Sequence, residues 1–244
     1  LYDELNRPIT TGLIEYSGSR TQLQENVNSV ATVSNTTNLS FSGTLTGNSN
    51  FSYQLRVNGN PIPATVRYIA LTITHYDVYP GLVPLFDPSF NSKLSAGQNE
   101  SPEPNTSASE QALVETKGMV THTLTRILNN PADPDAGQWL SNTTYYDRKG
   151  RVLQTHSRHI SGGTDVVTNM YDFSGKLICT YSAHRNPAVT DPNWQQMSIR
   201  TIFNFDALGR LKYIQKALND DFNAQKTIVT HTYDYAGRLS NKAL

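Results

Sequence analysis

The chain has 244 residues and a mass of 27.1 kDa, and its 20 Lys and Arg balance its 20 Asp and Glu. This length is enough to bury a core, either as one large β domain or as two ordinary domains. Because a zero net charge with dispersed basic residues gives no electrostatic footprint for phosphate backbones or anionic lipid, the composition argues against nucleic acid or a membrane surface as partner.

Residues 1–117 are predicted to form an N-terminal β region. Helical spacing of Leu23, Val27 and Val30, with Ser19 three residues before Gln22 as in a capping box, predicts a short helix within residues 17–33. Runs of β-branched and aromatic residues predict strands at 39–45, 52–57 and 66–76. The segment Asn58-Gly59-Asn60 predicts a hairpin turn between the second and third of these strands. Residues 87–116 have little apolar pattern and predict a long polar loop or a disordered crossing.

Residues 118–244 are predicted to form a second β region. Strands are expected at 119–128 and 138–146, joined by the turn-rich segment 129–137, and then at 166–171, 176–181, 198–205, 211–215 and 227–233. The only cysteine, Cys179, excludes an intrachain disulfide and a cysteine-based metal site. No apolar run approaches the roughly 20 residues that span a bilayer.

A short motif recurs along this second region. Its pattern is an aromatic residue, Asp, two free positions, Gly, a basic residue and an aliphatic residue. The units start at residues 146, 171, 205 and 233, an irregular spacing within the roughly 20 to 50 residues of repeat architectures. The four copies are Tyr146-Asp147-Arg148-Lys149-Gly150-Arg151-Val152, Tyr171-Asp172-Phe173-Ser174-Gly175-Lys176-Leu177, Phe205-Asp206-Ala207-Leu208-Gly209-Arg210-Leu211 and Tyr233-Asp234-Tyr235-Ala236-Gly237-Arg238-Leu239.

The residues of this motif are typical of a hairpin tip. Asp accepts hydrogen bonds from backbone N–H groups just ahead of it, and Gly adopts the positive φ that closes such a turn. A degenerate copy opens the chain as Tyr2-Asp3-Glu4-Leu5-Asn6-Arg7, where Asn6 takes the glycine position and is the next best residue there. The sequence therefore predicts an all-β fold of antiparallel hairpin repeats in an open, twisted sheet.

The repeated motif resembles the YD repeats of RHS (rearrangement hot spot) proteins. The stretch from Gly118 to Pro187 is similar to the RHS proteins of Bacteroidetes through residues 143–147, 150–155 and 171–177. In the N-terminal half the likeness covers only residues 2–7 and 73–79. The resemblance implies a β-sheet strip that spirals into a shell, secreted or at the cell surface, around a variable C-terminal cargo or toxin domain.

On this resemblance, the expected function is structural: the chain contributes wall area to a larger YD-repeat protein, and its partners are the remainder of that protein and its cargo. The chain is too short to close a shell, begins at Leu1 without a signal segment, and stops at Leu244 within a repeat, so we interpret it as a segment of that wall. The Asp-Pro pairs at Asp87, Asp133 and Asp191 lack the context of the family's self-cleavage site. We expect a free sheet edge to favour edge-to-edge self-association.

Residues that could carry chemistry have simpler structural explanations. The repeat aspartates suit turn capping better than catalysis or calcium binding, and the basic residues suit pairing with Asp or covering an aromatic ring. His156 and His159 are three apart, so on a strand they face opposite sides and do not share a metal. Cys179 lies in an apolar strand and is expected to be buried. We therefore predict no enzyme activity, cofactor or metal site.

One alternative function stays open from the sequence. The 13 Tyr, together with Trp139 and Trp194, keep a carbohydrate-binding β module possible, because exposed aromatic rings stack on sugars. Such a module would place two or three coplanar rings on one exposed face. Repeat positions already account for three of the Tyr, which favours the structural interpretation.

Overall fold

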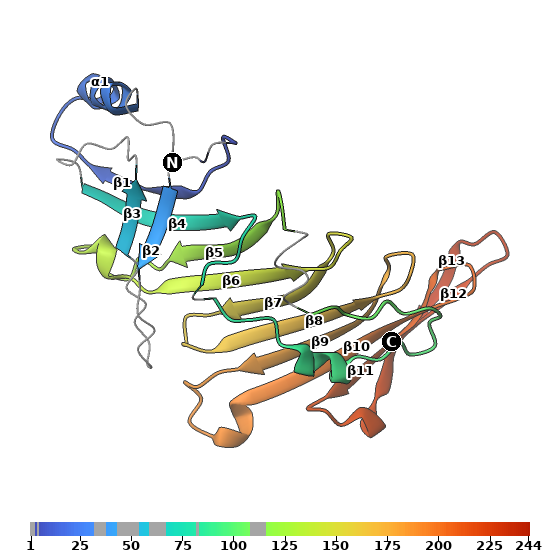
Figure 1. Ribbon diagram of the computed structural model, residues 1–244. Coiled ribbons are helices and arrows are strands. Elements are labelled where there is room, and N and C mark those ends of the chain that lie inside the picture. Colours follow the sequence, from blue (N-terminus) through green and yellow to red (C-terminus); the bar gives the residue numbers. More distant parts are fainter. Residues whose placement is uncertain are drawn as a thin grey trace. The chain divides into compact units, whose positions relative to one another are not determined.

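The computed structural model describes residues 3, 5–31, 38–42, 54–58, 67–81, 83–107 and 116–244. Within them, eleven strands form one open antiparallel sheet in the order β1-β4-β5-β6-β7-β8-β9-β10-β11-β12-β13, and β2 and β3 form a separate pair (Figure 1). The all-β, antiparallel fold class is confirmed. The strands are β1 Thr10–Glu15, β2 Asn38–Ser42, β3 Gln54–Asn58, β4 Arg67–Tyr76, β5 Val120–Arg126, β6 Trp139–Tyr146, β7 Val152–Arg158, β8 Thr164–Tyr171, β9 Leu177–Arg185, β10 Gln196–Phe205, β11 Leu211–Leu218, β12 Lys226–Tyr233 and β13 Leu239–Ala243.

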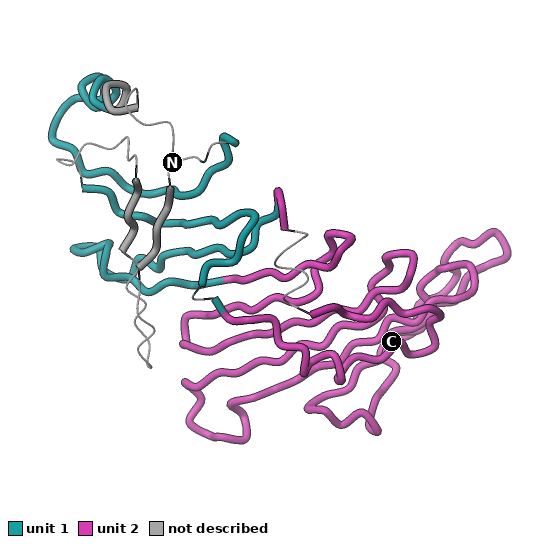
Figure 2. The backbone as a smooth tube through the Cα atoms, viewed as in Figure 1, with its two compact units in different colours: residues 1–83, 119–141 teal, residues 84–118, 142–244 magenta. Residues whose placement is uncertain are grey.

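The chain divides into two compact units, coloured separately in Figure 2. Unit 1 comprises residues 1–83 and 119–141, and unit 2 comprises residues 84–118 and 142–244. Unit 1 therefore contains β1 to β5, and unit 2 contains β7 to β13. Strand β6 begins in unit 1 and ends in unit 2.

The predicted N-terminal helix is confirmed as α1, Arg20–Ala31. Its capping box is formed, because the Gln22 side chain accepts the Ser19 backbone N–H at 2.9 Å and the Ser19 hydroxyl accepts the Gln22 N–H at 3.3 Å. These reciprocal bonds satisfy backbone groups that the first helical turn leaves without partners.

One expectation about the first half is wrong. The hairpin between the second and third predicted strands does not form, because β3 pairs with β2 while β4 pairs with β1 and β5; Gly59 and Asn60 of its turn lie outside the described residues. Of the two alternatives for residues 87–116, the described part, residues 87–107, forms a long loop that includes the 3-10 helix Pro88–Lys93. Further 3-10 helices lie at Pro134–Ala136, Pro192–Trp194 and Phe222–Ala224.

The core of unit 1 packs Ala70, Ile73, Leu124 and Trp139 together on β4, β5 and β6. The Arg126 guanidinium lies 4.4 Å from the centre of the Trp139 ring, which stabilises the cation against the ring face. Trp139 is therefore a core residue and is not presented to a ligand.

A partly buried histidine of unit 1, His75, predicts acid sensitivity. Burial lowers the pKa of His75 on β4 to about 4, from the ordinary 6.5. The unfolded chain binds this proton more readily, so the stability that neutral His75 provides is complete above pH 6.5 and is lost as the pH falls to 4. We expect urea titrations to show a loss of about 3 kcal/mol in unfolding free energy across this window. The loss should be smaller in His75→Gln; an equal loss in that variant would contradict the assignment.

In unit 2, residues 84–107 run over one face of the sheet, and we call this segment the strap. The Tyr145 hydroxyl donates to the carbonyl of Pro84, and the buried Gln154 side chain bonds both backbone groups of Asp87, at 2.8 and 3.1 Å. Further along, the Lys93 ammonium lies 2.7 Å from the Asp220 carboxylate. The buried side-chain oxygen Oδ1 of Asn204 accepts the Gln98 N–H at 2.9 Å. Polar side chains of the sheet thus hold the strap.

Candidate functional site

The four repeat motifs fold into the same backbone turn. In each turn the Asp N–H donates to the carbonyl of the basic residue four positions later, at 2.8 to 2.9 Å, and the Gly N–H donates to the Asp carbonyl at 2.8 to 3.0 Å. The glycines Gly150, Gly175, Gly209 and Gly237 have φ of 75°, 92°, 75° and 78°. A Cβ would be strained in this conformation, so glycine is favoured there.

The turn aspartates use their carboxylates within their own turns. In the first unit, one oxygen of Asp147 accepts the Lys149 and Arg151 N–H groups at 2.8 Å each, and the other lies 2.5 Å from the Arg151 side chain. Arg210 and Arg238 bond Asp206 and Asp234 in the same way. Hydrogen bonds from the Arg210 backbone and then its side chain hold the pKa of Asp206 below its ordinary value. This arrangement accounts for the acids without a bound cation.

The N-terminal copy has the same geometry, although Tyr2 lies outside the described residues. Asp3 N–H donates to the Arg7 carbonyl and Asn6 N–H to the Asp3 carbonyl, each at 3.0 Å. Asn6 has φ of 60°, and the Arg7 Nε lies 2.6 Å from the Asp3 carboxylate. Asn therefore fills the glycine position of this turn.

Each turn also contacts the next one. The Arg151 guanidinium lies 4.6 Å from the centre of the Tyr171 ring, the Lys176 ammonium 5.4 Å from that of Phe205, and the Arg210 guanidinium 4.4 Å from that of Tyr233. We call each such pair of a base and the following aromatic ring a rung. In two rungs the Tyr hydroxyl also donates backwards, from Tyr171 to the Val152 carbonyl at 2.9 Å and from Tyr233 to the Leu211 carbonyl at 2.8 Å.

Unit 1 contains a rung that the sequence did not reveal. The Arg7 guanidinium lies 4.3 Å from the centre of the Tyr76 ring, and the Tyr76 hydroxyl donates to the Pro8 carbonyl at 3.1 Å. Asp77 N–H donates to the Met119 carbonyl at 3.0 Å, and Gly118 has φ of 82°. Tyr76 and Asp77 thus take the first two positions of the motif, and Gly118 and Met119 take the positions of the Gly and the base. A long insertion replaces the two free positions between Asp and Gly. That insertion hides the motif from a search by spacing.

Asp77 obtains its cation from the preceding turn. Met119 stands where other motifs have a base, and the Arg7 guanidinium instead bonds both Asp77 oxygens, at 3.1 and 2.6 Å. Arg7 therefore forms ion pairs with both Asp3 and Asp77. Such a two-point contact fixes the guanidinium plane over the Tyr76 ring.

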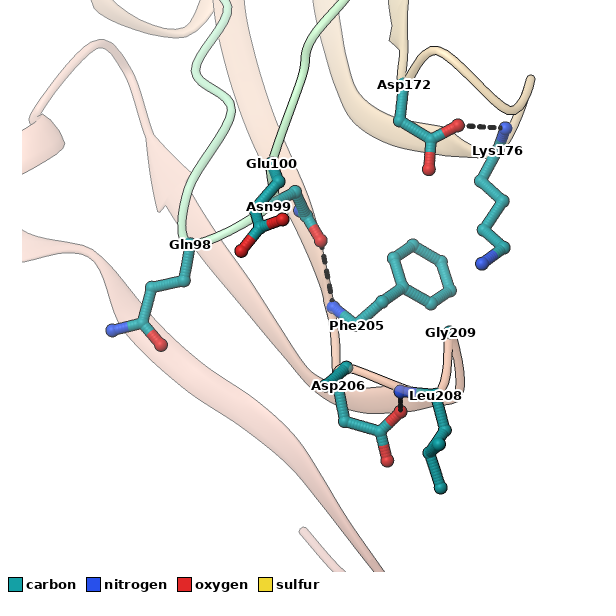
Figure 3. A pocket seen from close by; sticks show the side chains of 10 residues that line it. Gln98, Asn99, Glu100, Asp172, Lys176, Phe205, Asp206, Leu208 and Gly209 are labelled. Carbon is teal, nitrogen blue, oxygen red and sulfur yellow. Dashed lines mark hydrogen bonds between the residues drawn. The ribbon is translucent and has the colours of Figure 1, made fainter.

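The rung of Lys176 and Phe205 departs from the others and opens a cavity. Lys176 extends toward Phe205 and Gly209 rather than toward Asp172, whose carboxylate accepts the Ser174 hydroxyl at 2.7 Å (Figure 3). Burial raises the pKa of Asp172, but the bonds from Ser174 and Lys176 outweigh burial and hold this pKa below its ordinary value.

This cavity, of about 480 Å³, lies between the strap and two turns and is lined by Gln98, Asn99, Glu100, Asp172, Lys176, Phe205, Asp206, Ala207, Leu208 and Gly209. Asn99 fixes the strap there by accepting the Phe205 N–H at 3.0 Å. Among the described residues that line the cavity, none is a Ser, Cys or His nucleophile or base. The polar lining of the cavity can bind a polar group.

The altered rung supports a stabilising substitution. Phe205 has no hydroxyl, whereas the Tyr171 and Tyr233 hydroxyls each donate to a backbone carbonyl of the preceding turn. The accepting residue, Val152 or Leu211, directly follows the base of that turn. In Phe205→Tyr we expect the new hydroxyl to donate to the Leu177 carbonyl and to raise the unfolding free energy by about 1 kcal/mol in urea titrations. Tyr171→Phe should lower it by a similar amount. A neutral result for both variants would show that the hydroxyls do not stabilise the rungs.

Other residues singled out in the sequence have structural partners. Cys179 is buried, and burial raises the pKa of its thiol, as expected for a core position. The Asp-Pro aspartates Asp87, Asp133 and Asp191 each begin a 3-10 helix by accepting the N–H two residues ahead. His156 bonds Gln154, at 2.6 Å, and the structure does not bring it together with His159. His159 instead lies with Asp165 and His184, a grouping that the spacing along the chain did not show.

The fold defines an all-β protein with one open antiparallel sheet, in which cation–π contacts join successive hairpin tips of unit 2. No model of a known family matches this chain, and no curated protein is detectably similar to it. Among the described residues, no helix has both the length and the apolar character to cross a bilayer.

Proposed function

We propose that this chain is a structural segment of a larger YD-repeat protein, in which a continuous β-sheet forms a wall that encloses or presents a C-terminal cargo domain. The proposal rests on the rungs, which link the first two hairpin tips of unit 1 and the four successive repeat tips of unit 2. A wall of this kind needs neighbouring hairpins to be fixed to one another, and backbone pairing together with the rungs does this. Secretion or surface display follows from the same proposal.

The exposure of the basic residues carries the argument. The side chains of Arg151 and Arg210, each under a following aromatic ring, are 17% and 30% exposed. The side chain of Arg238 pairs with Asp234 in the same way but is 80% exposed. Strand β13 forms the edge of the sheet, and all five of its residues are exposed. A further hairpin with an aromatic residue at its tip would cover both.

The experiment is to express the coding sequence as far as it extends on both sides of this segment and to compare it with the isolated chain. We expect flanking aromatic-Asp-x-x-Gly-base units, amide exchange in β13 slowed at least about tenfold, and a C-terminal domain protected from protease. Edge-to-edge pairing of isolated chains could also slow amide exchange in β13, but such pairing is lost on dilution. The comparison is therefore made with dilute samples. Flanking sequence without such units, or unchanged β13 exchange, would overturn the proposal.

A glycan array tests the other class of function. Trp194 and Tyr235 are exposed, whereas Trp139 is buried. We expect no glycan to bind above background. Saturable binding that is lost in Trp194→Ala would favour a carbohydrate-binding module over a wall segment.

A further inference from the structure

Three side chains with metal-ligating atoms meet near the ends of two hairpins in unit 2. His159 lies in the turn between β7 and β8, Asp165 lies on β8, and His184 lies on β9, directly opposite Asp165 in the register. Their candidate ligand atoms all lie within 4.8 Å of one another. The His184 Nδ1 is 2.5 Å from the Asp165 carboxylate, and the two imidazole rings stack with centroids 5.2 Å apart and planes 8° apart.

The turn that holds His159 is built like the repeat turns. His159 N–H donates to the Gly163 carbonyl at 3.2 Å, Gly162 N–H donates to the His159 carbonyl at 2.9 Å, and Gly162 has φ of 77°. His159 therefore occupies the position of the repeat Asp. Gly163 is also required, since a Cβ there would lie 2.0 Å from the Arg185 carbonyl and 2.4 Å from the imidazole. The backbone thus leaves space for this ring.

The two nitrogens of His159 have different surroundings. Nδ1 lies 2.7 Å from the Ser161 hydroxyl, which fixes the ring orientation. Nε2 is shielded from solvent and has no hydrogen-bond partner among the described residues. A buried nitrogen without a partner is unfavourable, so an additional group bonded to Nε2 would remove this cost.

We propose that His159, Asp165 and His184 bind one divalent transition-metal ion of the kind that prefers imidazole and carboxylate ligands, such as Zn²⁺. Two imidazoles and one carboxylate are an established ligand set for such ions, and water would complete the coordination. The ligands of a tetrahedral zinc ion lie about 3.3 Å apart, so small side-chain rotations from the observed separations would close the site. The ion would join the end of the β7–β8 hairpin to β9.

The test uses the full chain, freed of any affinity tag and of metal, with Zn²⁺ and Co²⁺ as probes. We expect one ion per chain, a Kd of about 10 μM or lower by calorimetry, visible Co²⁺ absorption bands, and a higher Tm with excess Zn²⁺. His159→Ala and His184→Ala should each weaken binding about tenfold or more. Asp165→Asn, which keeps the shape of the side chain, should also weaken it.

The matched control is His231→Ala, because His231 lies on β12 outside the cluster. This variant should bind the ion as the unchanged chain does. Circular dichroism checks that each variant is folded. If an alanine variant is not folded, the Asp165→Asn variant tests the site in its place. The proposal is overturned if no ion binds at about 100 μM, or if the His159 and His184 variants bind as tightly as the His231 variant.

Discussion

Replacing Asp147 by Ala should destabilise the protein by about 3 kcal/mol in urea titrations. Asp147 is 6% exposed, and its carboxylate accepts two backbone N–H groups and the Arg151 side chain. In the variant, Arg151 keeps its contact with Tyr171 but loses its own counter-charge in a site that is largely closed to water. An uncompensated and poorly hydrated cation is costly, and the turn also loses its preorganisation.

The equivalent change in the last turn is the matched control. Asp234→Ala removes the same hydrogen bonds, but the Arg238 side chain is 80% exposed, so water replaces the lost partner. We expect this variant to lose about 1 kcal/mol, in the range of a capping bond with a surface ion pair. Equal losses in the two variants would show that burial of the ion pair does not control the stability of the turns.

Part of the fold was predictable because the repeat turns are local structures. The turn depends on residues within five positions of one another, in which Asp accepts local N–H groups and Gly allows positive φ, so the motif alone predicts the hairpins. Strands β1, β7 and β13 were not predicted from the sequence. The pairing of β3 with β2 rather than β4 could not be inferred, because it depends on long-range partners and not on local pattern.

The candidate site was predictable to a smaller degree. The pairing of each base with its own Asp follows from their spacing, but the stacking of Arg151 on Tyr171 requires knowing which hairpins are neighbours. The split motif of Asp77 and Gly118 is separated by an insertion, and the grouping of His159 with His184 arises across strands. In each case the informative contact joins residues far apart in the chain, where spacing carries no signal.

The contacts of the strap also join residues far apart in the chain, and breaking them is expected to cause a second large loss of stability. Its composition predicted a long polar loop or a disordered crossing, but it did not reveal the polar residues of the sheet that hold this segment. Among these residues, Gln154 bonds both backbone groups of Asp87. The Gln154 side chain is fully buried, accepts the Asp87 N–H, and donates to the Asp87 carbonyl and to the Thr168 hydroxyl at 2.8 Å. Gln154→Met keeps the length of the side chain and removes these bonds. We expect a loss of about 3 kcal/mol, because Asp87 and Thr168 are left without their partners.

This loss should be localised at the strap as well as global. Amide exchange at Asp87 and protease cleavage between residues 84 and 107 should both accelerate in Gln154→Met under native conditions, because the strap detaches before the sheet unfolds. Thr155→Val is the control, since the next residue of β7 faces the opposite side of the sheet. If Gln154→Met unfolds more easily while the strap stays protected, then the bonds from Gln154 stabilise the sheet and the strap is held by its other contacts.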